Sequence, residues 1–165
     1  MDNFAKALKA VRDLRSDGII EEYAIGGAMA VAFWSEPTAT FDLDIFVLLR
    51  SSGLLVSLEP IYEWAKKRGY AAKGEHIIMA GIPVQVIPAH DEPVEQAVAT
   101  AADLDYDGQH MRVIRPEYLI AMSLQGSART QKRVARAAHL LDEASLDRKL
   151  LEDLVKRYNL KLPQP

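Results

Sequence analysis

Residues 25–49, IGGAMAVAFWSEPTATFDLDIFVLL, decide the fold class because they combine a glycine pair with an Asp-x-Asp motif. The glycines Gly26 and Gly27 follow Tyr23–Ile25, a short apolar segment typical of a strand. Small and apolar residues then fill Ala28–Trp34, which predicts a buried helix packed against a sheet. The stretch therefore predicts a strand, a glycine turn, a helix and a second strand in that order.

The second strand carries the residues best suited to chemistry. Apolar side chains alternate from Leu43 within Phe41–Leu49, so Asp42 and Asp44 are expected on the opposite face of this strand. Two carboxylates on one strand face suit a hard cation, Mg²⁺ or Mn²⁺, which also binds substrate phosphates. Glycines at the start of a helix let backbone N–H groups approach a phosphate closely. The pattern predicts a metal and phosphate site.

Outward from this stretch, the chain predicts helices and a hairpin. A helix spans Phe4 to Leu14 and closes near Asp17, and a further helix covers Ile61–Arg68. Residues 75–88 form an expected hairpin that turns at Ala80 and Gly81. Counting outward from that turn places His76 opposite Gln85 on the same side of the sheet.

The remaining elements are mainly helical. Asp91 is the expected N-cap of a helix that runs to Thr100, and Asp107-Gly108 forms a turn between two short strands. Three helical segments follow, at 116–124, 134–141 and 146–158. We expect one domain over residues 1–165, with a core over about 1–115 and a helical part over about 116–160.

Composition excludes several function classes. The 165 residues carry 20 basic and 23 acidic side chains, a formal net charge of -3, so no global field attracts nucleic acid or an anionic membrane. The chain has no cysteine, which excludes disulfides and thiol nucleophiles and suits a reducing compartment. We expect a cytoplasmic protein without a membrane partner, since the charged N-terminus resembles no signal peptide.

Ile25-Gly26-Gly27 and Thr40–Ile45 together resemble the signature of the nucleotidyltransferase superfamily. The resemblance implies a mixed α/β sheet flanked by helices, with C-terminal helices closing one side of a cleft. It also implies that Gly26 and Gly27 bind the nucleotide and that Asp42 and Asp44 hold Mg²⁺ or Mn²⁺ and act in catalysis. The implied reaction moves a nucleoside monophosphate from a nucleoside triphosphate, with ATP expected, to an acceptor hydroxyl.

The resemblance extends through 57–62, 81–88 and 116–129, and it looks like a small single-domain bacterial branch. Such proteins commonly have a third carboxylate on a neighbouring strand, where this chain has Gln85. Glutamine coordinates a metal through its carbonyl oxygen but accepts no proton at neutral pH. We therefore add Gln85 and His76 as candidate catalytic residues, with His76 as a base and Glu75 as its alternative.

A second departure lies near the C-terminal end. Related sequences carry a lysine where this chain has Ser123. Arg129, Lys132, Arg133 and Arg136 recur at helical spacings and form an expected basic stripe, with Arg129 and Lys132 as candidate nucleotide ligands. The stripe is equally well explained as the solvated face of a surface helix.

Two other functions stay open. A catalytically degenerate nucleotide-binding or protein-interaction module, regulatory or antitoxin-like, would explain the missing third carboxylate. A metal-dependent phosphohydrolase would also use Asp-x-Asp, although the glycine pair argues against it. The acceptor is left open among a protein, an RNA end and a small molecule, because one fold serves many substrates. A partner or a homodimer could complete the cleft.

Overall fold

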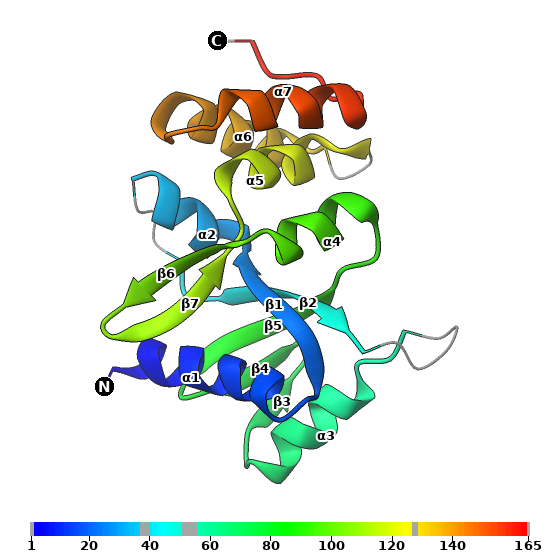
Figure 1. The fold of residues 1–165 in the computed structure, drawn as a ribbon. Coiled ribbons are helices and arrows are strands. Elements are labelled where there is room, and N and C mark those ends of the chain that lie inside the picture. Colours follow the sequence, from blue (N-terminus) through cyan, green and yellow to red (C-terminus); the bar gives the residue numbers. More distant parts are fainter. Residues whose placement is uncertain (1, 37–39, 51–55, 127–128, 165) are drawn as a thin grey trace.

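The computed structural model describes residues 2–36, 40–50, 56–126 and 129–164, which fold as one mixed sheet with helices on both faces (Figure 1). The first half of these residues forms α1 (Asn3–Ser16), β1 (Ile20–Gly26), α2 (Gly27–Trp34), β2 (Leu43–Leu49), α3 (Glu59–Lys67), β3 (Ala71–Lys73), β4 (His76–Met79) and β5 (Ile82–Pro88). The second half forms α4 (Glu92–Ala99), β6 (Ala102–Tyr106), β7 (Gln109–Val113), α5 (Pro116–Leu124), α6 (Gln131–Glu143) and α7 (Arg148–Arg157). The α/β class predicted from the sequence is confirmed.

The seven strands that the described residues form lie in the order β3-β4-β5-β2-β1-β7-β6. The pairs β2–β5 and β1–β7 are parallel and the other neighbours are antiparallel. This order places β2 at the centre of the sheet, between β5 of the β4–β5 hairpin and β1. The Asp-x-Asp strand is thus flanked on one side by the glycine strand and on the other by the strand of Gln85.

The core lies mainly between α1 and the sheet. Leu8 and Leu14 of α1 are buried, as are Leu43, Ile45 and Val47, the alternate residues of β2. Figure 1 shows α1 and α3 on one side of the sheet, while α2, α4 and α5 lie on the other. The sheet face that carries Asp44 is therefore turned away from the α1 core.

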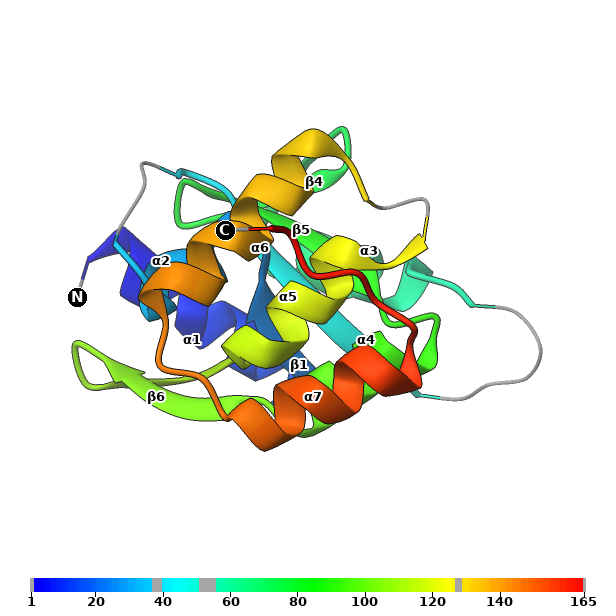
Figure 2. The ribbon, with the colours of Figure 1, turned by 90° about the horizontal axis from the view of Figure 1, so that it is seen from above.

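The C-terminal helices form a second layer beyond that face. Helix α5 is buried on nearly all sides and contacts α4, α6 and α7, as expected for a helix that is apolar all round. Figure 2 shows α5, α6 and α7 stacked over the sheet when viewed from above. Helix α6 also contacts α2, the helix that follows the glycine pair. In the described part of the chain, no helix has the length and apolarity needed to cross a bilayer.

Several sequence predictions are confirmed at residue level. Asp91 caps α4 by accepting a hydrogen bond at Oδ1 from the N–H of Val94, over 3.2 Å. The hairpin turns at Ala80 and Gly81, and both residues have positive φ, as a two-residue turn of this type requires. Its register pairs His76 with Gln85, as the count from the turn predicts.

Other predictions were wrong in extent. Strand β1 begins at Ile20 rather than Tyr23, because Glu22 forms ion pairs with Arg15 at 3.1 Å and Arg112 at 3.2 Å that hold this acidic residue in the strand. Strand β3 was not predicted. Its residues are all exposed and include no β-branched side chain, so its pairing with β4 rather than local sequence preference holds it in place.

Candidate active site

Four residues from four strands form a row across one face of the sheet. Asp44 pairs with Gly26 of β1 on one side and with Gln85 of β5 on the other, and Gln85 pairs in turn with His76 of β4. Residues in register on neighbouring strands point to the same face, about 4.8 Å apart from strand to strand. The row therefore brings the glycine pair, one aspartate, the amide and the histidine into one site.

The glycine pair is shaped by its neighbours on β2. A Cβ atom on Gly27 would collide with the carboxylate of Asp44, and one on Gly26 would collide with the ring of Phe46. Gly27 also has φ of 61°, in the left-handed region that favours glycine. Gly26 ends β1 and Gly27 opens α2, so the Asp44 carboxylate lies against the backbone at the start of a helix.

Burial and like charge act together on Asp44. Its partial burial, and secondly the negative charge of Asp42, raise the pKa of Asp44 above its usual value. Arg136 and His76 oppose this rise. A bound cation would stabilise the ionised form of Asp44, because it would offset both the desolvation of the carboxylate and its repulsion by Asp42.

Arg136 of α6 lies near enough to this site for its charge to act on Asp44. Its partial burial, and secondly the charge of Arg133, lower the pKa of the Arg136 guanidinium, while Asp44 raises it. The guanidinium remains protonated at neutral pH, because arginine retains its proton under all physiological conditions. Helix α6 carries Arg136 and contacts both α5 and α2, so packing of the C-terminal layer brings this cation toward Asp44.

Asp42 lies outside the strand in which the sequence placed it. Strand β2 begins at Leu43, and Asp42 is exposed in the segment just before it. The β1 partner strand ends at Gly26, opposite Asp44, where the chain turns into α2, so no β1 residue is left to pair with residue 42. Asp42 remains close enough for its charge to act on Asp44.

Gln85 and Glu75 are joined by a hydrogen bond. The Nε2 of Gln85 donates to Oε2 of Glu75 over 3.2 Å. Glu75 is exposed in the turn between β3 and β4, next to His76. Gln85, at the position of the expected third carboxylate, is thus hydrogen-bonded to the carboxylate of Glu75, which precedes β4, the next strand beyond β5 from Asp44.

The predicted basic stripe is not continuous. Arg129 precedes α6, whose N-cap is Thr130, and its Nη1 donates to the backbone oxygen of Lys161 over 2.7 Å. The cap interrupts the helical spacing on which the stripe was based. Lys132 is exposed in the first turn of α6, and Ser123 is buried in α5. The sequence pattern included Arg136 but did not single it out, because its approach to Asp44 depends on helix packing.

The donor set suits a metal that arrives with a phosphate ligand. Within the described ranges, no group of three or more histidine, aspartate or glutamate side chains could hold a metal ion. Asp42 and Asp44 provide two carboxylates, and Mg²⁺ is commonly bound by one or two carboxylates together with substrate phosphates and water. Carboxylate donors and a neutral amide oxygen fit that ion and its partner phosphates.

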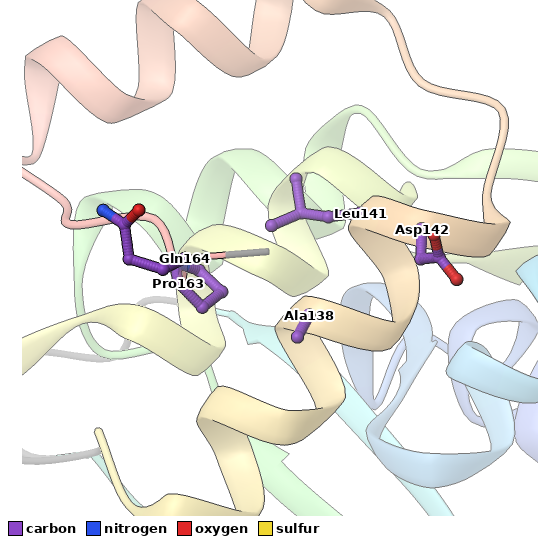
Figure 3. Close-up of a pocket in the computed structure, with 5 residues that line it drawn as sticks. All are labelled: Ala138, Leu141, Asp142, Pro163 and Gln164. Carbon is purple, nitrogen blue, oxygen red and sulfur yellow. The ribbon is translucent and has the colours of Figure 1, made fainter.

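A separate pocket of about 380 Å³ lies between α6 and the C-terminal segment. Figure 3 shows the residues that line it, Ala138, Leu141 and Asp142 from the helix and Pro163 and Gln164 from the tail. It contains none of the residues in the row across the sheet. The chemistry expected from the sequence thus belongs to the sheet face and not to this pocket.

The chain matches no protein-family model, and a comparison with curated proteins gave no match. Among solved structures it is similar to an antigenic nucleotidyltransferase-like protein from Paracoccidioides brasiliensis, with a TM-score of 0.55 and 17% identity, over 94% of this chain and 88% of that chain. The solution structure of the antibiotic-resistance factor ANT(2'')-Ia gives a TM-score of 0.52 at 14% identity, over 96% and 93% of the two chains.

A crystal structure of ANT(2")-Ia in complex with adenylyl-2"-tobramycin gives a TM-score of 0.53 at 12% identity, over 96% of this chain and 98% of that chain. Identities this low show that the folds are alike. They do not show that this chain acts on the substrates of those proteins. The sheet order, the helices on its two faces and these matches over almost the full chain agree with one another. The chain has the fold of the nucleotidyltransferase superfamily.

Proposed function

We propose that this protein transfers a nucleoside monophosphate from a nucleoside triphosphate, with ATP as the expected donor, to a hydroxyl group of an acceptor. The observation that carries the proposal is the row Gly26, Asp44, Gln85 and His76, with Arg136 acting on Asp44 from α6. The row offers a backbone turn, a carboxylate, an amide and an imidazole on one face of the sheet. Similar folds that act as nucleotidyltransferases support it.

Asp42 and Asp44 would hold the divalent ion, Mg²⁺ or Mn²⁺, that accompanies the triphosphate. Bound there, the ion would neutralise phosphate charge and orient the α-phosphate. Gly26 and Gly27 let the phosphates approach the start of α2 without a side chain in the way. Arg136, with Lys132 on the same helix, adds positive charge for the phosphates.

The transfer step is a substitution at phosphorus. The acceptor oxygen forms a bond to the α-phosphorus, and the bond from that phosphorus to the pyrophosphate oxygen breaks. The hydroxyl proton passes to His76, which lies about 10 Å from Asp44 along the row at two strand spacings. Gln85, between them, would orient the acceptor hydroxyl through its amide.

A second function is favoured by one observation, the neutral side chain at Gln85 next to Asp44. A protein that binds a nucleotide and metal without turnover, acting as a regulatory or interaction module, needs no third carboxylate and no base. Such a module retains the same phosphate and metal contacts. The two functions therefore differ in product formation and not in nucleotide binding.

One experiment separates the two functions. Purified protein is incubated with nucleoside triphosphates labelled at the α-phosphate, Mg²⁺ or Mn²⁺, and cell extract, beside the double variant Asp42→Asn/Asp44→Asn. Transfer predicts label on an acceptor that is absent with the variant. Metal-dependent nucleotide binding without label transfer supports the second function. Wild type that matches the double variant in both assays contradicts both functions.

The expectation of a partner or homodimer belongs to the same proposal. A second copy would complete the cleft over the exposed side of the row. Light scattering at working concentration tests this, because a strictly monomeric protein would contradict the homodimer.

A further inference from the structure

A second pocket, of about 330 Å³, lies beside Gln85 at the end of the row. Its walls are Leu58 and Tyr62 from the α3 region, Gly74 and Glu75 from the turn between β3 and β4, and residues 85–88 of β5. It shares Gln85 with the row of candidate catalytic residues. A molecule in this pocket would therefore lie beside Gln85, the neighbour of Asp44 in the row.

The pocket exists because two neighbouring strands differ in length. In the part of the chain that the structure describes, the β4–β5 register ends at His76 and Gln85, while β5 continues to Pro88. The far side of β5 still pairs with β2, through Val86 with Ile45 and Ile87 with Phe46. Past Gln85, the edge of β5 on the β4 side thus faces the pocket and offers backbone groups to a polar ligand.

The polar groups of the pocket define the chemistry of its ligand. Glu75 is the one charged residue among those that line it within the described residues. One of its oxygens accepts the Gln85 amide, and an ionised carboxylate has room for further hydrogen bonds from a donor. Leu58 and Tyr62 give an apolar wall, which is the usual composition of a small-molecule site.

Charge then separates the classes of acceptor. A protonated amine gains an ion pair with Glu75, and a hydroxyl on the same molecule can reach Gln85 beside it. An RNA end would bring phosphate groups to a pocket in which Glu75 supplies a negative charge, at a cost from like-charge repulsion. The volume suits a single ring or a short chain rather than a folded partner.

We propose that this pocket is the acceptor subsite and that the acceptor is a small hydroxylated molecule with a protonated amino group. The amino group pairs with Glu75, and the hydroxyl lies at Gln85, adjacent to Asp44. This inference rests on the proposed transfer function and names its substrate class. It uses residues other than those that hold the nucleotide, so the two can be tested separately.

The test uses two sugars that differ in one group, glucosamine with a protonated amine and neutral glucose. Ligand-observed saturation-transfer NMR on the full protein compares their affinities in the wild type, Glu75→Gln and the control Glu59→Gln on the exposed start of α3. We expect the wild type and Glu59→Gln to prefer glucosamine by about threefold or more, as an exposed ion pair allows. Glu75→Gln should remove that preference, with an unchanged melting temperature showing that it folds.

Equal binding of the two sugars by the wild type, or a preference for glucosamine that survives Glu75→Gln, would overturn the subsite. Binding of Mg²⁺·ATP is measured in parallel by calorimetry. Glu75→Gln should bind Mg²⁺·ATP as tightly as the wild type does. Loss of the glucosamine preference in Glu75→Gln, with intact nucleotide binding, supports the subsite. A wild type that does not bind Mg²⁺·ATP contradicts the transfer function, and the sugar preference then tests only whether the pocket binds a protonated amine.

Discussion

Gln85 of β5 lies directly beside Asp44 of β2, in a parallel register that puts both side chains on one face of the sheet. The carboxylate of Asp44 is already disfavoured in its charged form, because burial and the charge of Asp42 raise its pKa. Its neighbour on β5 is a neutral amide. The neutral amide avoids the like-charge repulsion that a second negative charge at residue 85 would add.

Replacing Gln85 with aspartate tests this relationship. Without metal, Gln85→Asp should lower the melting temperature by about 2–4 °C, because like charges opposite each other on a sheet cost up to about 1 kcal/mol. With Mg²⁺ present, the same variant should gain more stability than the wild type does, because the added carboxylate also binds the ion. Scanning calorimetry in chelator and in Mg²⁺ measures both changes.

The uncharged variant Gln85→Leu is the matched control, and its melting temperature should respond no more to Mg²⁺ than that of the wild type. If Gln85→Asp and the wild type gained equal stability from Mg²⁺, residue 85 would not share the ion with Asp44. The metal assignment would then rest on Asp42 and Asp44 alone.

The contact between Gly27 and Asp44 gives a second prediction. Gly27→Ala and Gly69→Ala both place a side chain on a residue with positive φ, at 61° and 79°, which costs about 1–2 kcal/mol. A Cβ at Gly27 also meets the Asp44 carboxylate, whereas one at Gly69 meets nothing within 4 Å. We expect Gly27→Ala to be less stable than Gly69→Ala by about 1–3 kcal/mol in urea unfolding.

Nucleotide binding should separate the same two variants. Gly69→Ala should retain Mg²⁺·ATP affinity, and Gly27→Ala should lose it because the collision displaces Asp44. Equal unfolding free energies for the two variants would mean that Asp44 moves aside easily. The close contact between its carboxylate and the N-terminus of α2 would then not be needed for function.

The parts of the fold that the sequence predicts correctly are those set by neighbouring residues. The hairpin register follows from Ala80 and Gly81, whose turn geometry fixes each opposing pair out to His76 and Gln85. The cap at Asp91 follows from its side chain and the helix beside it. Local signals of this kind need no knowledge of the rest of the chain.

The parts that were wrong or missed depend on residues far apart in the sequence. Where β2 begins is set by the end of β1 at Gly26, which left Asp42 outside the strand. The approach of Arg136 to Asp44 depends on α6 packing against α5 and α2. The link of Glu75 to Gln85 also needs the β3–β4 turn, and β3 has no sequence signal of its own. Helical spacing alone could not predict these contacts.

Arg136 supplies a third prediction. Arg136→Met keeps an unbranched apolar side chain and removes the charge, so Mg²⁺·ATP affinity should fall by about tenfold or more, as expected for a lost charge-assisted hydrogen bond. Arg148→Met on the exposed start of α7 is the control and should bind normally. Isothermal titration gives both affinities. Equal loss in the two variants would assign the effect to overall charge rather than to Arg136.

The raised pKa of Asp44 predicts how stability depends on pH. In the unfolded chain this carboxyl ionises near 3.8, and in the folded protein at a higher pH, so the folded state binds more protons between the two values. The stability that Asp44 contributes is therefore present below its unfolded pKa and is lost as pH rises through its folded pKa. At pH 7, without metal, ionised Asp44 should make the protein less stable.

Asp44→Asn removes that cost. We expect it to melt a few degrees above the wild type at pH 7 in chelator, where about 1 kcal/mol corresponds to 2–4 °C for a chain of this length, and to match it near pH 3. Saturating Mg²⁺ should reverse the order by stabilising only the wild type. Asp142→Asn, exposed on α6, should follow the wild type throughout. A difference between Asp44→Asn and the wild type that stays constant from pH 3 to 7 would show that Asp44 does not favour its protonated form, and the cation site would lose its electrostatic basis.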